Sequence, residues 1–472
     1  MSNESPLFDE DDFDLDLEEE LQSTLGDVFA EEEDDEELIT ESVDLDPPMK
    51  DMEAFSEPVE DDVVPSTSYD MDAIEGGSRA VPAISAVAFC ETPRTINLVE
   101  SVASDRRMMQ AVVDIHEGGM DTAIEYLQSN VTPNLLILES SADTDKMIAQ
   151  IDELAGHCDE GVQVMVIGAT NDIPLYRQLM ARGVSEYLVP PVSPVQVVRA
   201  IGDLFSDPDA PFVGKSISVI GAKGGVGAST IAHNLAWALS ENTMVNTALV
   251  DLDLSFGTTA LDFNHDSQQT VLDALMDPDR IDDAVVAKLL SKATDRLSLF
   301  AAPASVNQVI HIDDDSYATV INSVRRMMPY VVLDLPHGWN GWLYQTLISS
   351  DEVVLVCQPD LASLRNGKNM IDQVKADRPN DRPPRLIINM MGVPKRPEIP
   401  VKDFAAAIGV EPEVILPFDP QLFGTASNNG QMISETDPAA KPSLAIDYLA
   451  TVMTGRDAIQ PTKSLLQKLL GK

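Results

Sequence analysis

Hydrophobic residues gather into short runs that alternate with amphipathic stretches along most of this 472-residue chain. Between residues 84 and 205, apolar runs predict strands, and residues with helical spacing follow each run. We expect strands at Ile84–Phe89, Gln110–Ile115, Leu135–Leu138, Gln163–Ile167 and Tyr187–Val189, with helices near Ile96–Met108, Met120–Gln128, Asp143–Leu154, Pro174–Ala181 and Pro194–Phe205. Such βα repeats predict a doubly wound, flavodoxin-like parallel sheet.

A second α/β region begins with the apolar run Ile217–Ile220, which predicts a buried strand, and continues into a glycine-rich segment and a helix. The glycines let the backbone approach an anion closely and turn its N–H groups inward. The positive end of the helix dipole adds to this attraction. We therefore assign phosphate binding to Gly224, Gly225, Val226, Gly227, Ala228, Ser229 and Thr230.

This segment departs from the usual P-loop pattern G-x-x-x-x-G-K-[ST] at two positions, Ala222 and Ala228. Ala228 replaces the usual lysine, and Lys223 stands at the start of the loop instead. Ser229 or Thr230 lies where a hydroxyl would hold Mg²⁺. The lost charge-assisted contact to phosphate costs roughly 1.5–3 kcal/mol, or about 10- to 150-fold in affinity.

The order Lys-Gly-Gly-x-Gly-x-Ser, from Lys223 to Ser229, resembles the deviant Walker A motif of the MinD/ParA family. More narrowly, Gly-Ala-Lys-Gly-Gly-Val-Gly-Ala-Ser-Thr followed by Ile-Ala-His-Asn-Leu-Ala resembles the TadZ/CpaE branch, which serves Flp (tight-adherence) pilus assembly. The resemblance, over about residues 84–453, implies ATP and Mg²⁺ as cofactors. It also implies a nucleotide-linked homodimer, in which Lys223 reaches the partner's nucleotide. Because of Ala228, we expect a weak ATPase at best.

Carboxylates end two of the predicted strands. Residues 245–253 end in Asp251-Leu-Asp253, and an apolar run ends at Asp334 within Asp-x-Pro-x-Gly. Open α/β sheets bind ligands at such strand ends. The resemblance implies that Asp253 orients the attacking water and that Asp251 and Asp334 hold Mg²⁺ through water. The catalytic candidates are Lys223, Asp253 and Asp334, and the metal candidates are Ser229, Asp251 and Asp334.

Two later positions resemble the family's contacts to adenine. Asn389 follows the predicted strand Leu386–Ile388, and Pro417 lies in Val414–Asp419, which resembles the last strand and the adenine-side loop. A strand-end cap and a turn are the respective alternatives. The six histidines show no spacing typical of metal ligands, so we expect solvated or capping roles for them.

Acidic residues concentrate at the N-terminus. The formal net charge is −48, and residues 1–78 hold 30 of the 79 Asp and Glu residues but one lysine. We expect a disordered arm over residues 1–80, which either binds a partner or solvates the protein. Because phosphate neutralisation needs clustered Lys and Arg, we expect no binding to nucleic acid. The three scattered cysteines and the absence of a secretory signal predict a cytoplasmic protein.

Residues 133–139 resemble the third strand of a bacterial response-regulator receiver, with Glu139 at the position of the phosphate-accepting Asp. A receiver has a switch hydroxyl after its fourth strand and a lysine after its fifth. In this chain those positions are Gly168 and Pro190. Without this chemistry we expect no phosphotransfer. Residues 84–205 are therefore predicted to form a receiver-like module for interaction or dimerisation, with a purely structural domain as the alternative.

For the rest of the chain we expect a linker at 206–214, a MinD/ParA-like nucleotide-binding domain at 215–453 and a tail at 454–472. In the tail, four leucines form one helical face beside basic residues, which resembles the membrane-targeting tail of MinD-type proteins. Packing of the tail on its own ATPase domain is the alternative. The residues concerned are Leu465, Leu466, Leu469 and Leu470 with Lys463, Lys468 and Lys472.

These features predict a positioning protein for the pilus secretion machinery, with that machinery or polar landmark proteins as partners. It would act in the cytoplasm, at the inner membrane or the cell pole. Two alternatives stay open. One is an active MinD/ParA-type ATPase that positions another cargo, and the other is a signalling adaptor with a vestigial nucleotide site.

Overall fold

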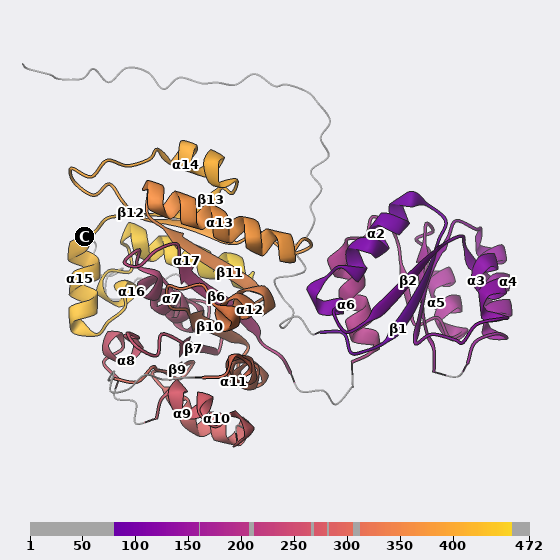
Figure 1. The fold of residues 1–472 in the computed structure, drawn as a ribbon, viewed down its shortest axis with the longest axis horizontal. Helices are drawn as coiled ribbons and strands as arrows, with labels where there is room; N and C mark the ends of the chain where they lie inside the picture. Colours follow the sequence, from indigo (N-terminus) through magenta and orange to yellow (C-terminus); the bar gives the residue numbers. More distant parts are fainter. Residues whose placement is uncertain are drawn as a thin grey trace, which may run out of the picture. The chain divides into compact units, whose positions relative to one another are not determined.

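The structure, a computed structural model, describes residues 80–159, 161–206, 212–265, 269–280, 283–304 and 312–455. The predicted acidic arm, except for Ala80, and the leucine-rich part of the tail lie outside these ranges. The described residues form two β-sheets, each with helices packed on it (Figure 1). No helix within the described ranges is both long enough and apolar enough to cross a bilayer.

The first sheet has the strand order β2-β1-β3-β4-β5, and all its neighbouring strands are parallel. This is the flavodoxin-like order, so the predicted fold class is confirmed. The elements are β1 (Ser85–Cys90), α2 (Pro93–Ala103), η3 (Arg106–Met108), β2 (Val112–Glu117), α3 (Met120–Leu127), β3 (Leu135–Ser140), α4 (Thr144–Ala155), β4 (Gln163–Gly168), α5 (Ile173–Ala181), β5 (Glu186–Leu188) and α6 (Pro194–Leu204).

Alternating side chains of these strands pack into two separate apolar layers. In β1, Val87 and Phe89 face the helices α3, α4 and α5, whereas Ala86 and Ala88 face α2 and α6. Each βαβ connection places its helix on one face of the sheet, and different connections use different faces. Both faces of the strands are therefore buried, which explains why these strands are apolar throughout. One expected helix differs from the structure. The predicted helix at 96–108 ends at Ala103, and a separate 3₁₀ turn follows it.

The physical reason for this break is a capping side chain. Asp105 has extended backbone angles, and its carboxylate accepts a hydrogen bond from the backbone N–H of Arg107 at 2.9 Å. The same carboxylate receives the guanidinium of Arg107 at 2.7 Å. An aspartate with these partners starts a new turn and does not continue the old one.

The second sheet has the order β13-β12-β11-β6-β10-β7-β9-β8, and only the edge pair β8–β9 is antiparallel. Its elements are β6 (Lys215–Gly221), α7 (Ala228–Trp237), η4 (Ala238–Asn242), β7 (Thr247–Asp251), α8 (Thr259–Asp262), α9 (Val271–Leu275), η5 (Pro278–Arg280), α10 (Asp283–Leu289), β8 (Ser291–Lys292), β9 (Leu297–Phe300), α11 (Asp314–Met327), β10 (Tyr330–Asp334), α12 (Gly341–Ser349), β11 (Glu352–Cys357), α13 (Leu361–Asp377), β12 (Arg385–Met391), α14 (Val401–Ile408), β13 (Pro412–Pro417), α15 (Pro420–Asn429), α16 (Ile433–Thr436) and α17 (Lys441–Thr454).

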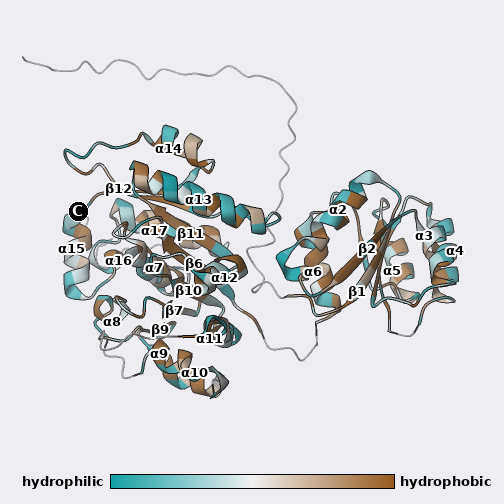
Figure 2. Cartoon of the chain, in the orientation of Figure 1, coloured by the Kyte–Doolittle hydropathy of each residue, from teal (hydrophilic) through white to brown (hydrophobic). Residues whose placement is uncertain are grey.

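This sheet is also covered on both faces. Helices α7, α15 and α17 pack on one apolar layer, and α11 to α14 pack on the other. Figure 2 shows hydrophobic residues concentrated in the strands and hydrophilic residues on the outer sides of the helices. After β6 the chain continues to β7 on one side of β6. Later in the sequence, β11 pairs with β6 on its opposite side. Ligands of open α/β sheets bind at the carboxyl ends of strands where the order reverses in this way.

One predicted strand of this region was too long. The run 245–253 forms β7 only over Thr247–Asp251, so Asp253 lies in the following loop. The carboxylate of Asp251 accepts a hydrogen bond from the backbone N–H of Asp253 at 3.1 Å, which turns the chain away from the sheet. The short strand β9 was missed because four residues carry little periodic signal.

Candidate functional site

The glycine loop, residues 222–227, connects the central strand β6 to helix α7. Strand β6 pairs with β11 on one side and with β10 on the other. Gly225 and Gly227 have φ angles of 76° and 85°, and Gly227 caps the N-terminus of α7. Residues with a Cβ adopt this left-handed conformation at a cost, which explains the two glycines. The loop therefore ends at the positive end of a helix dipole, as the sequence predicted.

Three side-chain amides from outside the loop hold its carbonyl oxygens. We call these three residues the amide clamp. They come from different elements, namely the end of β11, the first half of α13 and the end of β12. The bonds are Gln358 Nε2 to Gly225 O at 3.0 Å, Asn366 Nδ2 to Ala222 O at 3.0 Å and Asn389 Nδ2 to Val226 O at 2.9 Å.

The amide clamp orients the N–H groups of the loop. In a trans peptide the C=O of one residue and the N–H of the next point in opposite directions. Holding the carbonyls of Ala222, Gly225 and Val226 therefore turns the N–H groups of Lys223, Val226 and Gly227 the opposite way. Within the described residues, none of the backbone N–H groups from 223 to 227 donates a hydrogen bond. These donors are consequently free to bind an anion.

A cavity of about 260 Å³ opens beside the start of α7. Gly227 and Thr230 line it, and so do Asn389 and Pro417 from the ends of β12 and β13. Four of the predicted binding residues thus share one cavity. The rest of its wall includes the apolar side chains Met390, Phe418, Phe423, Met432 and Ile433. An apolar cavity with a few polar groups is typical of a small-molecule site.

Lys223 does not line this cavity. Its Nζ forms an ion pair at 2.7 Å with Oδ2 of Asp360, and both side chains are partly exposed. Asp360 also caps α13 by accepting the backbone N–H of Ser363 at 2.8 Å. Burial by itself would raise the pKa of Asp360. The hydrogen bonds from Lys223 and Ser363 outweigh burial and lower this pKa below its usual value. Lys223 therefore lies at the carboxyl edge of the sheet and takes no part in the wall of the cavity.

The two predicted carboxylates Asp251, at the end of β7, and Asp253, just after it, bind backbone groups of the loop that follows. Asp251 is fully buried and accepts N–H groups of Asp253 and Thr259 at 3.1 and 3.2 Å. Burial and the charge of Asp334 raise the pKa of Asp251. Asp253 accepts the N–H of Phe256 at 3.0 Å. Both carboxylates thus hold the loop 252–259 in place.

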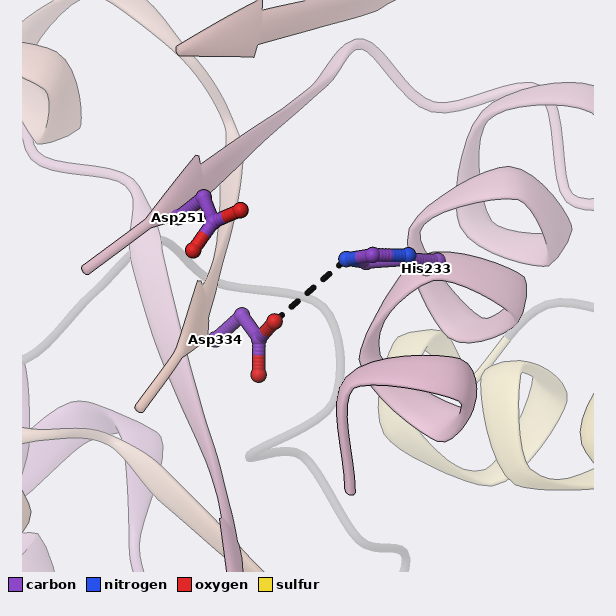
Figure 3. Close-up of side chains that lie close together, drawn as sticks. All are labelled: His233, Asp251 and Asp334. Atoms are coloured by element: carbon purple, nitrogen blue, oxygen red, sulfur yellow. Dashed lines mark ion pairs between the residues drawn. The ribbon is translucent and has the colours of Figure 1, made fainter. Parts of the chain in front are cut away.

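Asp334 is the exception among the acidic candidates. It ends β10, has no exposed surface, and neither carboxylate oxygen has a hydrogen-bond partner among the described residues. Its oppositely charged neighbour is the imidazole of His233, whose Nε2 lies 3.3 Å from Oδ2 of Asp334 (Figure 3). A buried charge without hydrogen bonds is costly. The carboxylate oxygens of Asp334 therefore fit the oxygen donors that a divalent cation such as Mg²⁺ takes.

The sequence predicted solvated or capping roles for the histidines and no functional role for His233. It is 1% exposed. Its Nδ1 lies 2.8 Å from Oδ2 of Asp262, and its Nε2 lies 3.0 Å from Oγ1 of Thr259. Burial would lower the pKa of His233, but the carboxylates of Asp262 and Asp334 raise it. One sequence signal was present, since His233 follows Ser229 by four residues and thus shares its helix face.

In the first sheet, Glu139 occupies the predicted acceptor position at the end of β3. Its carboxylate accepts two backbone N–H groups, from Glu91 at 2.7 Å and Thr92 at 2.8 Å. It also accepts the hydroxyls of Thr92 at 2.8 Å and Thr95 at 2.7 Å. The carboxylate therefore serves as a fixed anion at the N-terminus of α2, where the helix dipole favours negative charge.

Comparisons with known proteins found a matching family model and several similar proteins. The family model described as an AAA domain matches residues 214–382. A pilus assembly protein CpaE from Caulobacter crescentus CB15 is 45% identical over 27% of this chain and 98% of its own, with a TM-score of 0.27. A protein from Sinorhizobium meliloti 1021 described as a CpaE2 pilus assembly protein is 36% identical over 26% of this chain and 99% of its own, with a TM-score of 0.25.

The septum site-determining protein MinD of Helicobacter pylori is 25% identical over 234 residues, which are 47% of this chain and 84% of that protein. The range matched by the family model contains the strand, glycine loop and helix described above. The second sheet and its helices therefore have the P-loop NTPase fold, as the sequence predicted.

Proposed function

The chain belongs to the family of CpaE pilus assembly proteins, and we propose that it is an ATP-binding positioning protein for the Flp-pilus secretion machinery. One observation carries the proposal, namely the glycine loop whose N–H groups are turned away from the amide clamp beside a cavity. The nucleotide-binding domain comprises residues 215–453. The receiver-like module at 84–205 would contact a partner protein. That partner would be the pilus machinery or a polar landmark protein.

In this proposal the phosphates of ATP bind the N–H groups of residues 223–230, and the adenosine occupies the adjacent cavity. Pro417 stacks on the base. Asn389 contacts the adenine with the amide hydrogen that does not bind Val226. Mg²⁺ accompanies the phosphates, with the hydroxyl of Ser229 and the carboxylate of Asp334 as its protein partners. The cation would neutralise phosphate charge, which matters here because Ala228 supplies none.

A nucleotide-linked homodimer is part of this proposal, with Lys223 as the residue that links the two copies. Three large apolar side chains are exposed after central strands of the second sheet: Phe256 after β7, Trp339 after β10 and Leu361 after β11 are 77%, 49% and 73% exposed. A second copy of the chain would cover them, because the carboxyl ends of parallel strands share one edge of the sheet. In the dimer, Lys223 leaves Asp360 and binds the partner's nucleotide.

Slow hydrolysis or none is the expected chemistry. The carboxylates of Asp251 and Asp253 accept backbone N–H groups of the segment that follows β7 and are engaged in holding that segment. The P-loop lysine is also missing. Turnover near that of lysine-containing relatives would favour the alternative, an active ATPase that positions another cargo.

The experiment combines calorimetry with ATP and Mg²⁺ and molar-mass measurement by light scattering, on the full-length protein. We expect ATP binding and an ATP-dependent dimer. Lys223→Ala should reduce dimerisation more than ATP affinity. Lys368→Ala is the matched control, because Lys368 pairs with Asp372 on α13 at 2.8 Å, within its own helix. If Lys223→Ala dimerises like the parent but loses ATP, the lysine acts in cis. If the parent binds no ATP, the nucleotide site is vestigial and the adaptor function is favoured.

We further propose that the tail at 454–472 contacts an anionic membrane, which would place the dimer at the inner membrane or cell pole. Each lysine near an anionic surface adds about 1 kcal/mol, and two tails in one dimer bind better than one. The test is co-sedimentation with anionic vesicles. Deletion of residues 462–472 should abolish ATP-dependent binding. Unchanged binding after deletion would favour packing of the tail on its own domain.

A further inference from the structure

We propose that His233, Asp251 and Asp334 form a buried binding site for a divalent transition-metal ion such as Zn²⁺ or Mn²⁺. We call these residues the metal cluster. They come from three elements, α7, β7 and β10, and all are buried. One ligand atom of each lies within 4.8 Å of the others. Figure 3 shows the imidazole pointing from its helix toward the two carboxylates at the strand ends.

The hydrogen bonding of His233 matches that of a metal-binding histidine. Such a histidine usually donates its second ring N–H to a carboxylate, which fixes the ring and raises the basicity of the coordinating nitrogen. Here Nδ1 donates to Oδ2 of Asp262 at 2.8 Å. The opposite nitrogen, Nε2, lies 3.3 Å from Oδ2 of Asp334 and 3.0 Å from Oγ1 of Thr259, so a bound ion would replace the contact with that hydroxyl. Asp262 therefore supplies the outer partner of the site.

Asp334 provides independent support for a bound cation. Both its oxygens are buried and lack hydrogen-bond partners among the described residues. In the tetrahedral geometry of Zn²⁺, bonds of about 2.1 Å to nitrogen or oxygen place neighbouring ligand atoms roughly 3.4 Å apart. The ligand atoms of the metal cluster lie within 4.8 Å of one another, so the most widely separated ones would move together by up to roughly 1.4 Å to hold the ion. An ion would then give the carboxylate of Asp334 a second partner besides the imidazole of His233, which lies 3.3 Å from Oδ2.

The nitrogen ligand decides the class of metal. Mg²⁺ takes oxygen ligands and keeps several waters, whereas imidazole with carboxylates suits transition metals. The site also has an entry path, because His233 and Asp262 line the cavity beside α7. An ion bound by one oxygen of Asp334 leaves the other oxygen for the proposed Mg²⁺. The inference therefore adds a second cation to the proposed nucleotide site and needs no nucleotide to form.

The test is metal content after equilibrium dialysis without nucleotide. Metal-free, full-length protein is dialysed against Zn²⁺, Mn²⁺ or Mg²⁺, and bound metal is measured by mass spectrometry. His116→Ala is the control for adventitious binding, because His116 lies in the first sheet and stacks on Phe89. We expect the parent and this control to bind one equivalent of Zn²⁺ more than His233→Gln. Asp262→Asn should weaken that binding about 10- to 100-fold.

Equal zinc content in the parent and His233→Gln would overturn the inference, and so would binding of Mg²⁺ as tight as that of Zn²⁺. If His233→Gln fails to fold, Asp262→Asn decides, because asparagine keeps the size of the side chain. Co²⁺ provides a second readout, since its visible absorption reports the ligands. ATP binding is measured separately, so the failure of this site leaves the proposed function standing. Zinc binding without ATP binding would refute the proposed ATP-binding function and leave the metal site standing.

Discussion

Removing donors of the amide clamp should weaken nucleotide binding without unfolding the protein. Gln358 and Asn366 each donate one hydrogen bond of 3.0 Å to a carbonyl of the glycine loop. A hydrogen bond of this kind contributes about 0.5–1.5 kcal/mol net. If the whole contribution serves to hold the loop ready for phosphate, Gln358→Ala or Asn366→Ala lowers ATP affinity by up to about 13-fold. The two effects need not add, because both residues act on one loop.

The assay is calorimetry with ATP and Mg²⁺ on the parent, both single variants and the double variant. Gln373→Ala is the matched control, because Gln373 lies on α13 like Asn366 but donates to Tyr344 and Asp377 on the protein surface. Thermal denaturation checks that each variant is folded. An unchanged ATP affinity in the folded double variant would refute the reasoning, since the loop would then hold its shape without the clamp.

Three further predictions concern other parts of the chain. Ala228→Lys should raise ATP affinity about tenfold by restoring a charge-assisted phosphate contact; calorimetry showing equal or weaker binding would mean that the loop has changed shape. Glu139→Ala should destabilise the first domain by about 1.5–3 kcal/mol, because a charged acceptor of four hydrogen bonds is lost, whereas the exposed Glu100→Ala should have little effect on urea denaturation. Burial, then the charge of Glu139, raises the pKa of Cys90 to about 12, and burial with Asp360 raises that of Cys357 to about 12. Burial and then the charge of Asp159 raise the pKa of Cys158 as well, so accessibility decides the order. Iodoacetamide at pH 8 should modify the half-buried Cys158 before the buried Cys90 and Cys357, and mass spectrometry showing earlier loss of Cys90 or Cys357 would contradict this.

The sequence by itself determined the features that depend on local patterns. Alternating apolar runs and helical spacing predicted the flavodoxin-like sheet, because each strand and helix carries its own periodicity. The glycine loop was recognisable for the same reason, since Gly225 and Gly227 meet a local requirement for positive φ. Local signals were weaker at boundaries. The helix 96–108 and the strand 245–253 were drawn too long, because side chains of Asp105 and Asp251 turn the backbone at points that periodicity does not reveal.

Only the tertiary structure decided which distant side chains meet. The amide clamp joins residues 133 to 163 positions apart, and no local pattern distinguishes such an amide from a solvated one. The same holds for the ion pair of Lys223 with Asp360 and for the metal cluster around His233. These contacts form because parallel strands from separate parts of the chain bring their carboxyl ends to one edge of the sheet. Their partners are therefore set by strand order, which depends on how the whole sheet packs.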